Sequence, residues 1–241
     1  MSARPPRPDQ QEFDLEQLTP TRQAIADRTA QSFATKPHFS MTCLADASAM
    51  VALREKLRAD GASPLPTYND LLMKACARVL QDQRRLNAWL DDEGLKLLRR
   101  VNIAFAAATE AGVLMPVVLD ADQKSLADLA AETHERVTLA RAGKLRATLQ
   151  MGAGFSISNI GPGRVESFTA IISAPQVAIL SIGALAERPV VRDHAVVVLP
   201  TIYLTLTVDH RAVDGADSAA FLRDLVALLE DADALAAVCG V

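Results

Sequence analysis

Hydrophobic and polar positions follow two periods along the chain, and these periods predict a succession of helices and strands. Apolar residues spaced three and four apart predict helices, whereas short apolar runs between turn residues predict strands. Helices are expected at 20–34, 46–59, 67–82, 125–145 and from about 216 onward, and apolar strand segments at 38–46, 101–109, 112–119, 155–163, 168–185 and 196–208. Hairpins are expected at 86–98 and around 192–193. This mixture predicts one α/β (α+β) domain without internal repeats.

Residues at the predicted helix ends support these boundaries. Thr19 before Pro20, Thr67 and Ser125 each stand where a hydroxyl can cap the first turn, and Gly143 lies near the end of the 125–145 helix. Residues 1–18 are rich in Pro, Arg, Gln and Asp, which predicts a loose arm ahead of a domain at 19–241.

Composition excludes several kinds of partner. The chain has 241 residues, half of them apolar, and a net charge of −4 without a basic cluster, so nucleic acid is not an expected partner. It has no apolar run long enough for a membrane span and no signal peptide at its start, so we expect a cytoplasmic protein that does not bind membranes. Cys43, Cys76 and Cys239 are widely spaced among small or apolar residues, which predicts reduced thiols rather than disulfides.

The segment TLTVDHRAVDGADS at 205–218 carries the main chemical signal. It runs from an apolar strand through a turn into a helix, so His210 is held by rigid backbone and can still reach a cleft. Imidazole titrates near neutrality and suits a general base. His134 and His194 are expected to be surface or structural residues, and His38 to pack or form hydrogen bonds.

Other catalytic motifs are missing from the sequence. There is no HExxH, CxxC, Walker loop, dinucleotide fingerprint or GxSxG elbow, so metal, redox, ATP-dependent and serine-hydrolase chemistry are not predicted. Ser158 and Asn159 remain as polar residues at the end of an apolar strand, before a Gly-Pro-Gly turn. Serine and asparagine are also common in ordinary turns, so these two residues alone do not indicate a catalytic site.

HRAVDG at 210–215 fits the HxxxDG pattern of the CoA-dependent acyltransferases that include chloramphenicol acetyltransferase. The fuller DHRAVDGADSAAFLRDL closely resembles the catalytic domain of the E2 dihydrolipoamide acyltransferases of 2-oxo acid dehydrogenase complexes. The resemblance covers Leu18 to about Glu230, with TKPHFSM, TYNDLLMKACARVL, FSISNIG and APQVAILSIGA in the family's order. Condensation domains of peptide synthetases share the fold but read HHxxxDG; Asp209 replaces the first histidine, which counts against them.

The resemblance implies a fold, a site and an assembly. The fold would be a chloramphenicol acetyltransferase-like mixed sheet flanked by helices, with the active site at a trimer interface. His210 would be the base, Ser158 would donate a hydrogen bond to the oxyanion, and Asp214 would brace the loop that orients the imidazole. Acetyl-CoA would be the acyl donor, with no metal and no lipoyl group on this chain.

Only about 18 residues precede the first predicted helix, where relatives carry lipoyl and subunit-binding domains. On that ground we expect a free acetyltransferase acting on a hydroxyl of a small molecule, such as a tetronate intermediate in natural-product biosynthesis. The alternatives are a dihydrolipoamide acyltransferase core of a 2-oxo acid dehydrogenase complex and a catalytically idle assembly protein. The tail DADALAAVCGV is expected to run past the usual family end and to leave an isolated homotrimer.

Overall fold

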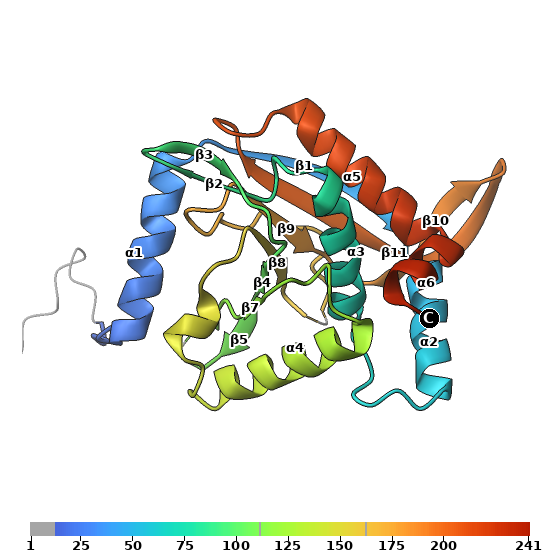
Figure 1. Cartoon of the computed structure of the whole chain (residues 1–241), viewed down its shortest axis with the longest axis horizontal. Coiled ribbons are helices and arrows are strands. Elements are labelled where there is room, and N and C mark those ends of the chain that lie inside the picture. Colours follow the sequence, from blue (N-terminus) through green and yellow to red (C-terminus); the bar gives the residue numbers. More distant parts are fainter. Residues whose placement is uncertain (1–12, 111, 162) are drawn as a thin grey trace, which may run out of the picture.

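The centre of the molecule is a seven-stranded mixed sheet (Figure 1). The computed structural model describes residues 13–110, 112–161 and 163–241. In the sheet, β8 runs parallel to β4 and β9, and the other pairs are antiparallel. The strands, in spatial order, are β1 (His38–Asp46), β11 (Ala195–Asp209), β9 (Ala178–Ile182), β8 (Phe155–Asn159), β4 (Ile103–Phe105) and β7 (Val117–Val118), with β10 (Ala186–Arg192) paired to β11.

The long strand β11 organises the sheet. It pairs with β1 from His38↔Asp209 to Asp46↔Thr201, and its first half pairs with β10 to form a hairpin that projects from the body (Figure 1). Alternate residues such as Leu204 and Leu206 are fully buried on one face, whereas the other face carries threonines and Asp209. One face of β11 therefore belongs to the apolar core, and the opposite face is polar.

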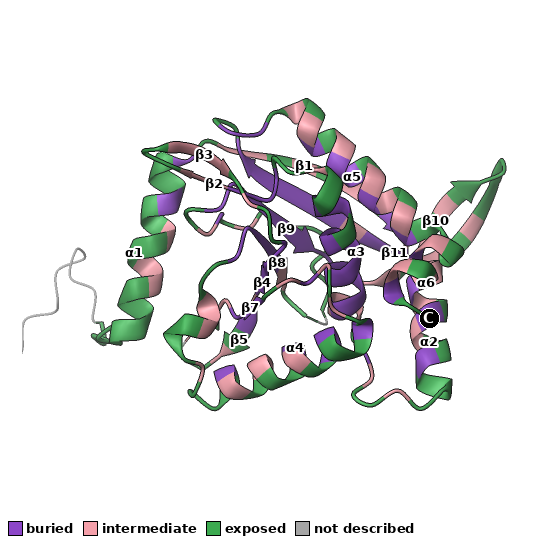
Figure 2. Cartoon of the chain, in the orientation of Figure 1, coloured by how far each residue is buried: buried purple, intermediate pink, exposed green. Residues whose placement is uncertain are grey.

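Helices pack on the apolar face of the sheet. The α-helices are α1 (Pro20–Thr35), α2 (Ser48–Ala59), α3 (Tyr68–Asp82), α4 (Leu126–Arg141), α5 (Gly215–Glu230) and α6 (Ala232–Cys239), and a short 3₁₀-helix, η1, spans Ala147–Gln150. Of these, α1 is largely exposed and contributes no apolar side chain to the core. The helices α2 and α5 contact β11, while α3 packs against α4, α5 and α6 and is the most buried helix (Figure 2). This arrangement confirms the predicted α/β class.

The predicted helix caps are confirmed. The hydroxyls of Thr19, Thr67 and Ser125 accept hydrogen bonds from backbone N–H groups in the first turns of α1, α3 and α4. Thr67 forms a full capping box with Asp70, whose carboxylate also accepts a 2.7 Å hydrogen bond from Thr133 on α4. The cap of α3 thus also ties two helices together.

Two of the predicted strand segments are broken. The segments at 101–109 and 112–119 each form two short strands: β4 and β7 belong to the main sheet, whereas β5 (Ala107–Thr109) and β6 (Gly112–Leu114) form a separate pair. Pro116 cannot donate to a ladder, and the N–H of Ala106 donates to Ile157 instead of to the paired segment. Residue 111 of the connecting turn lies outside the described residues.

Both predicted hairpins are present, and the predicted strand segment at 168–185 is shorter than expected. In the segment 168–185 only β9 is a strand, and the hairpin at 86–98 is present as β2 (Ala88–Asp91) and β3 (Gly94–Leu97). Asp193 and His194 both have positive φ at the turn of the β10–β11 hairpin, as a type I′ turn requires. Of the predicted arm, residues 1–12 lie outside the described part, and 13–18 are exposed and form neither helix nor strand.

The three cysteines are free thiols, as predicted. Burial raises the pKa of Cys43 to about 11, and the charge of Glu230 adds to this effect. Burial also raises the pKa of Cys239 to about 11, against the opposing charge of Lys74.

Within the described ranges, no helix is both long and apolar enough to cross a membrane.

Candidate active site

His210 lies immediately after β11, where the sheet ends. Its backbone N–H donates a 3.0 Å hydrogen bond to the carbonyl of Pro37, just before β1, so both neighbouring strand ends hold its main chain. Its side chain is exposed and meets the Phe39 ring edge to face, with the ring centroids 4.9 Å apart. The imidazole is therefore accessible to a substrate while one side of it rests on an aromatic ring.

The turn after His210 leads into α5 and is closed by backbone hydrogen bonds. The N–H groups of Ala212 and Val213 donate to the Asp209 carbonyl at 2.9 and 3.1 Å. The Asp214 carboxylate then accepts from the N–H groups of Asp217 and Ala216, which makes it the N-cap of α5.

Asp214 acts on the turn rather than on the imidazole ring. The hydrogen bond from the Asp217 N–H lowers the pKa of the Asp214 carboxyl, and the Ala216 N–H and the nearby charges of Arg85 and His210 add to this effect. Its hydrogen bonds thus go to the helix. Any effect on the orientation of His210 is transmitted through the backbone of the turn.

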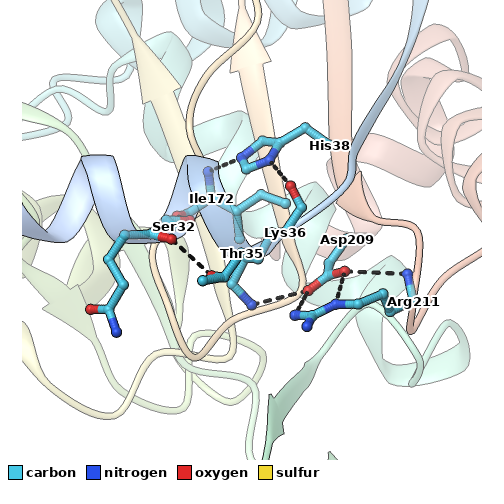
Figure 3. Close-up of polar contacts among 8 residues, drawn as sticks. Ser32, Thr35, Lys36, His38, Ile172, Asp209 and Arg211 are labelled. Atoms are coloured by element: carbon cyan, nitrogen blue, oxygen red, sulfur yellow. Dashed lines mark hydrogen bonds and ion pairs between the residues drawn. The ribbon is translucent and has the colours of Figure 1, made fainter.

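Asp209, the residue before His210, forms a buried ion pair with Lys36 (Figure 3). Its side chain is fully buried, and its carboxylate accepts 3.1 Å from Lys36 Nζ and 2.9 and 2.7 Å from the Arg211 guanidinium. Burial would raise the pKa of the Asp209 carboxyl, but the hydrogen bonds from Arg211 and Lys36 outweigh it and hold that pKa below its usual range. The residues on both sides of His210 are therefore fixed by charge.

The same network reaches His38 and the segment before β9 (Figure 3). The Nε2 atom of His38 accepts a 3.1 Å hydrogen bond from the Ile172 N–H, so Nδ1 carries the proton and donates to the Lys36 carbonyl at 2.8 Å. Ser32 on α1 donates to the Ile172 carbonyl. His38 thus has the hydrogen-bonding role expected from the sequence, and both of its ring nitrogens are occupied.

Ser158 lies near the end of β8 and is half-buried. Asn159 follows it and fixes the strand end: its amide donates 2.8 Å to Asn69 on α3, and its carbonyl oxygen accepts from the Gly161 N–H at 2.7 Å. Residue 162 of the Gly-Pro-Gly turn lies outside the described residues. The side chain that precedes this anchored turn is thus supported by the sheet and by α3.

One chain does not bring Ser158 and His210 together. Ser158 pairs with Ser181, which pairs with Thr205, and His210 is five residues further along the chain. This register separates the two residues by roughly 17 Å along the strands and about 10 Å across them. A base and an oxyanion donor must both lie about 3 Å from the reacting group. The two residues of one chain therefore cannot serve the same substrate.

Sequence reasoning missed three contributors to this region. Phe39 lies against His210, Lys36 neutralises Asp209, and the Asp209 carboxylate itself is buried. A signal for Asp209 existed, because it continues the polar alternation of Thr205 and Thr207 on one face of β11. Nothing local marks Lys36 as its partner. No cluster of metal-binding side chains occurs in the part of the chain that the structure describes.

Comparison with known proteins identifies the family. Residues 10–237 match the family described as 2-oxoacid dehydrogenases acyltransferase (catalytic domain). The chain belongs to this family. Similar proteins include the dihydrolipoyllysine-residue acetyltransferase component of the pyruvate dehydrogenase complex of Bacillus subtilis, which is 37% identical over 90% of this chain and 50% of that protein. The corresponding Staphylococcus aureus protein is 35% identical over 91% of this chain and 52% of its own length. The chain thus spans about half the length of the curated relatives it matches.

Solved structures agree with this assignment. The dihydrolipoamide acetyltransferase of Azotobacter vinelandii matches with a TM-score of 0.89 at 34% identity, over 98% of this chain and 99% of that chain. That relative was studied for the role of a serine, a histidine and an asparagine in its catalytic mechanism. The cubic core of a pyruvate dehydrogenase complex matches equally well, with a TM-score of 0.89. A chloramphenicol acetyltransferase matches with a TM-score of 0.54 at 12% identity, which confirms the predicted fold.

We predict that Asp209→Asn destabilises the protein by about 3 to 5 kcal/mol at pH 7, because it leaves the Lys36 ammonium buried without its counter-charge. The folded-state pKa of Asp209 is depressed, so its contribution is present above the unfolded value of about 3.9 and is lost as the pH falls through the folded value. Denaturant unfolding should be measured at pH 7 and at about pH 3. The difference in free energy of unfolding between wild type and Asp209→Asn should be smaller at the lower pH.

The matched control is Asp82→Asn, which breaks the exposed Arg78–Asp82 pair. It should change stability by less than about 1 kcal/mol. If Asp209→Asn lowers the free energy of unfolding by the same amount at both pH values, Asp209 is not an ionised, paired carboxylate in the folded protein.

Proposed function

We propose that the protein transfers an acetyl group between CoA and the thiol of a dihydrolipoyl group, with His210 as general base and Ser158 as oxyanion donor. One observation carries the assignment. The serine and histidine studied in the Azotobacter vinelandii relative are 52 positions apart, as are Ser158 and His210, and the asparagine follows the histidine by four positions, as Asp214 follows His210. The fold match over nearly both whole chains supports this equivalence.

The proposed reaction needs only a proton shuttle and a donor for negative charge. His210 removes the proton of the acceptor thiol as its sulfur attacks the thioester carbonyl carbon, and Ser158 donates a hydrogen bond to the resulting oxyanion. Collapse of this intermediate breaks the bond to the CoA sulfur, which leaves with the proton from the imidazolium. A base contributes about 100- to 10,000-fold to such a reaction, and an oxyanion donor about 100- to 1,000-fold.

The proposed acceptor is a thiol, whereas the sequence led us to expect a hydroxyl of a natural-product intermediate. The comparisons do not support that acceptor: the curated relatives quoted above are dihydrolipoyllysine acetyltransferases. The expectation rested on the short segment ahead of the first helix, and a chain that matches half of its relatives does not establish what precedes it. The dehydrogenase-complex alternative therefore becomes the proposal.

We further propose that each active site is shared between two chains of a homotrimer. The separation of Ser158 and His210 within one chain requires a second copy to complete the site. Exposed apolar surface supports association: Val191, Val196 and Val198 of the projecting β10–β11 hairpin are 75%, 73% and 64% exposed. By alternation, Val196 and Val198 lie on the same face of β11 as the core residue Leu204, beyond the part that helices of the same chain cover.

The C-terminal tail gives less support to an isolated trimer than the sequence suggested. Residues Ala232–Cys239 form α6, which packs on its own chain with Leu235 buried. The chain of the cubic core is matched over 99% of its length by 98% of this chain, so the tail is not an extension relative to that chain. Larger particles built from trimers are thus compatible with the chain length.

The acceptor is tested by offering acetyl-CoA with dihydrolipoamide in one reaction and with small hydroxyl compounds, tetronates first, in another. We expect acetyl-dihydrolipoamide to form, because a thiol gives up its proton to an imidazole base more readily than a hydroxyl does. Product analysis by mass spectrometry separates the outcomes. Efficient acetylation of a hydroxyl compound with none of dihydrolipoamide would overturn the proposed acceptor and restore the earlier expectation.

The catalytic pair is tested by His210→Ala and Ser158→Ala, each expected to lower turnover by at least about 100-fold with little change in acetyl-CoA binding. If the site is shared, co-expression of the two variants in equal amounts should restore about a quarter of wild-type turnover, because random mixing pairs an intact His210 with an intact Ser158 at that frequency. Light scattering should give three chain masses of 25.8 kDa or a multiple of that trimer.

Two results would contradict this scheme. Near-wild-type turnover of His210→Ala would remove the base from the mechanism. Mixed particles without any recovered turnover, or a stable monomer that is fully active, would refute the shared site.

Asp214 is expected to act as a helix cap rather than as a charge. Asparagine caps helices as well as aspartate does, so Asp214→Asn should keep most of the turnover. Asp214→Ala removes the hydrogen bonds to the Ala216 and Asp217 N–H groups and should lower both turnover and the thermal midpoint. Steady-state kinetics and thermal unfolding of both variants check this. Equal loss in the two variants would show that the charge matters instead.

A further inference from the structure

The polar face of the sheet carries a transverse row of four hydroxyl side chains. Thr42 on β1 is opposite Thr205 on β11, Thr205 is opposite Ser181 on β9, and Ser181 is opposite Ser158 on β8. Directly paired residues of neighbouring strands place their side chains on the same face. The strands β1, β11, β9 and β8 are adjacent in the sheet (Figure 1). The row therefore crosses four neighbouring strands and ends at Ser158, the proposed oxyanion donor.

At one end of the row, Thr42 and Thr205 are hydrogen-bonded to each other, whereas Ser181, next to Ser158, has no partner in the described part of the chain. The Oγ1 atoms of Thr42 and Thr205 are 2.9 Å apart, and the next pair on the same face, Ser40 and Thr207, is also joined at 2.9 Å. Ser181 is 1% exposed, and its Oγ has no hydrogen-bond partner among the residues that the structure describes. A buried hydroxyl without a partner is costly to retain.

The segment around Glu166 packs closely against the chain just after Ser181. Gly183, two residues along the same face, lies so close to the Glu166 carbonyl that a Cβ atom there would collide with it. The Ala184 N–H donates to the Val165 carbonyl at 2.9 Å, which holds this segment in place. Backbone therefore packs closely beside the buried Ser181, whose hydroxyl has no partner in the described structure.

We propose that Ser181 is a positioning residue for Ser158: its O–H donates a hydrogen bond to Ser158 Oγ and leaves the Ser158 proton directed at the oxyanion. Residues opposite each other on neighbouring strands are about 4.8 Å apart, so a staggered rotation of one side chain brings the two hydroxyls into contact. The donated bond orients the Ser158 hydroxyl, which otherwise rotates freely, and makes it a stronger donor. This inference rests on the proposed role of Ser158.

The test is Ser181→Ala, alone and combined with Ser158→Ala, assayed with acetyl-CoA and dihydrolipoamide. Alone it should lower kcat by roughly 5- to 20-fold with KM little changed, because one orienting hydrogen bond is lost. In the Ser158→Ala background it should cause no further loss, because the hydroxyl that it orients is absent. The thermal midpoint should change little, because the loss of one hydrogen bond is offset by no longer burying a hydroxyl.

Ser48→Ala is the matched control, because Ser48 on α2 also has a buried hydroxyl without a partner in the described structure and lies on a different element from both serines. It should leave kcat unchanged. The inference would be overturned, and the role of Ser158 kept, if Ser181→Ala had wild-type kcat while Ser158→Ala was impaired. The same conclusion would follow if Ser181→Ala lowered kcat equally in wild type and in Ser158→Ala. Full turnover in Ser158→Ala would overturn the proposed oxyanion role together with this inference.

Discussion

The proposed active site depends on the ion pairs that the buried carboxylate of Asp209 forms. A charge that is fully removed from water must be neutralised by partners in fixed positions, and here the partners are Lys36 at the end of α1 and Arg211 in the turn after β11. These contacts hold the strand end, the first helix and the His210 backbone in one geometry. The imidazole of His210 is therefore exposed on a fixed backbone, with one side of its ring against Phe39.

The geometry of the sheet separates the two residues that family chemistry needs together. His210 continues β11 past the end of the sheet, whereas Ser158 lies level with the middle of that strand, two strands away. Neither residue can move far, because each is held by backbone hydrogen bonds in or beside the sheet. In the proposed function, such a rigid scaffold completes a site only where two copies meet. Catalysis and assembly are therefore one property in the proposed function.

The polar face of the sheet distinguishes this fold from a sheet that is apolar on both sides. Its threonines and serines pair with each other across the strands, and Ser156 donates to Gln176 in the same layer. Most of these hydroxyls are thus satisfied by side chains of the same face, and Ser181 is the exception described above. The same face carries Ser158 on β8, while the opposite face supplies the apolar core.

The sequence by itself determined the helices with their caps, the α/β class, and the place of His210 between a strand and a helix, because these features depend on local periodicity and on hydrogen bonds within a few residues. The family resemblance added Ser158 and Asp214. The resemblance also implied that this serine and histidine come from neighbouring subunits. Only the tertiary structure paired Asp209 with Lys36, which is 173 residues away, and broke the apolar segments around Ala106 and Pro116. It also gave the strand register that separates Ser158 from His210 within one chain. Those outcomes depend on strand register and long-range packing, and neither leaves a periodic trace in the amino-acid pattern.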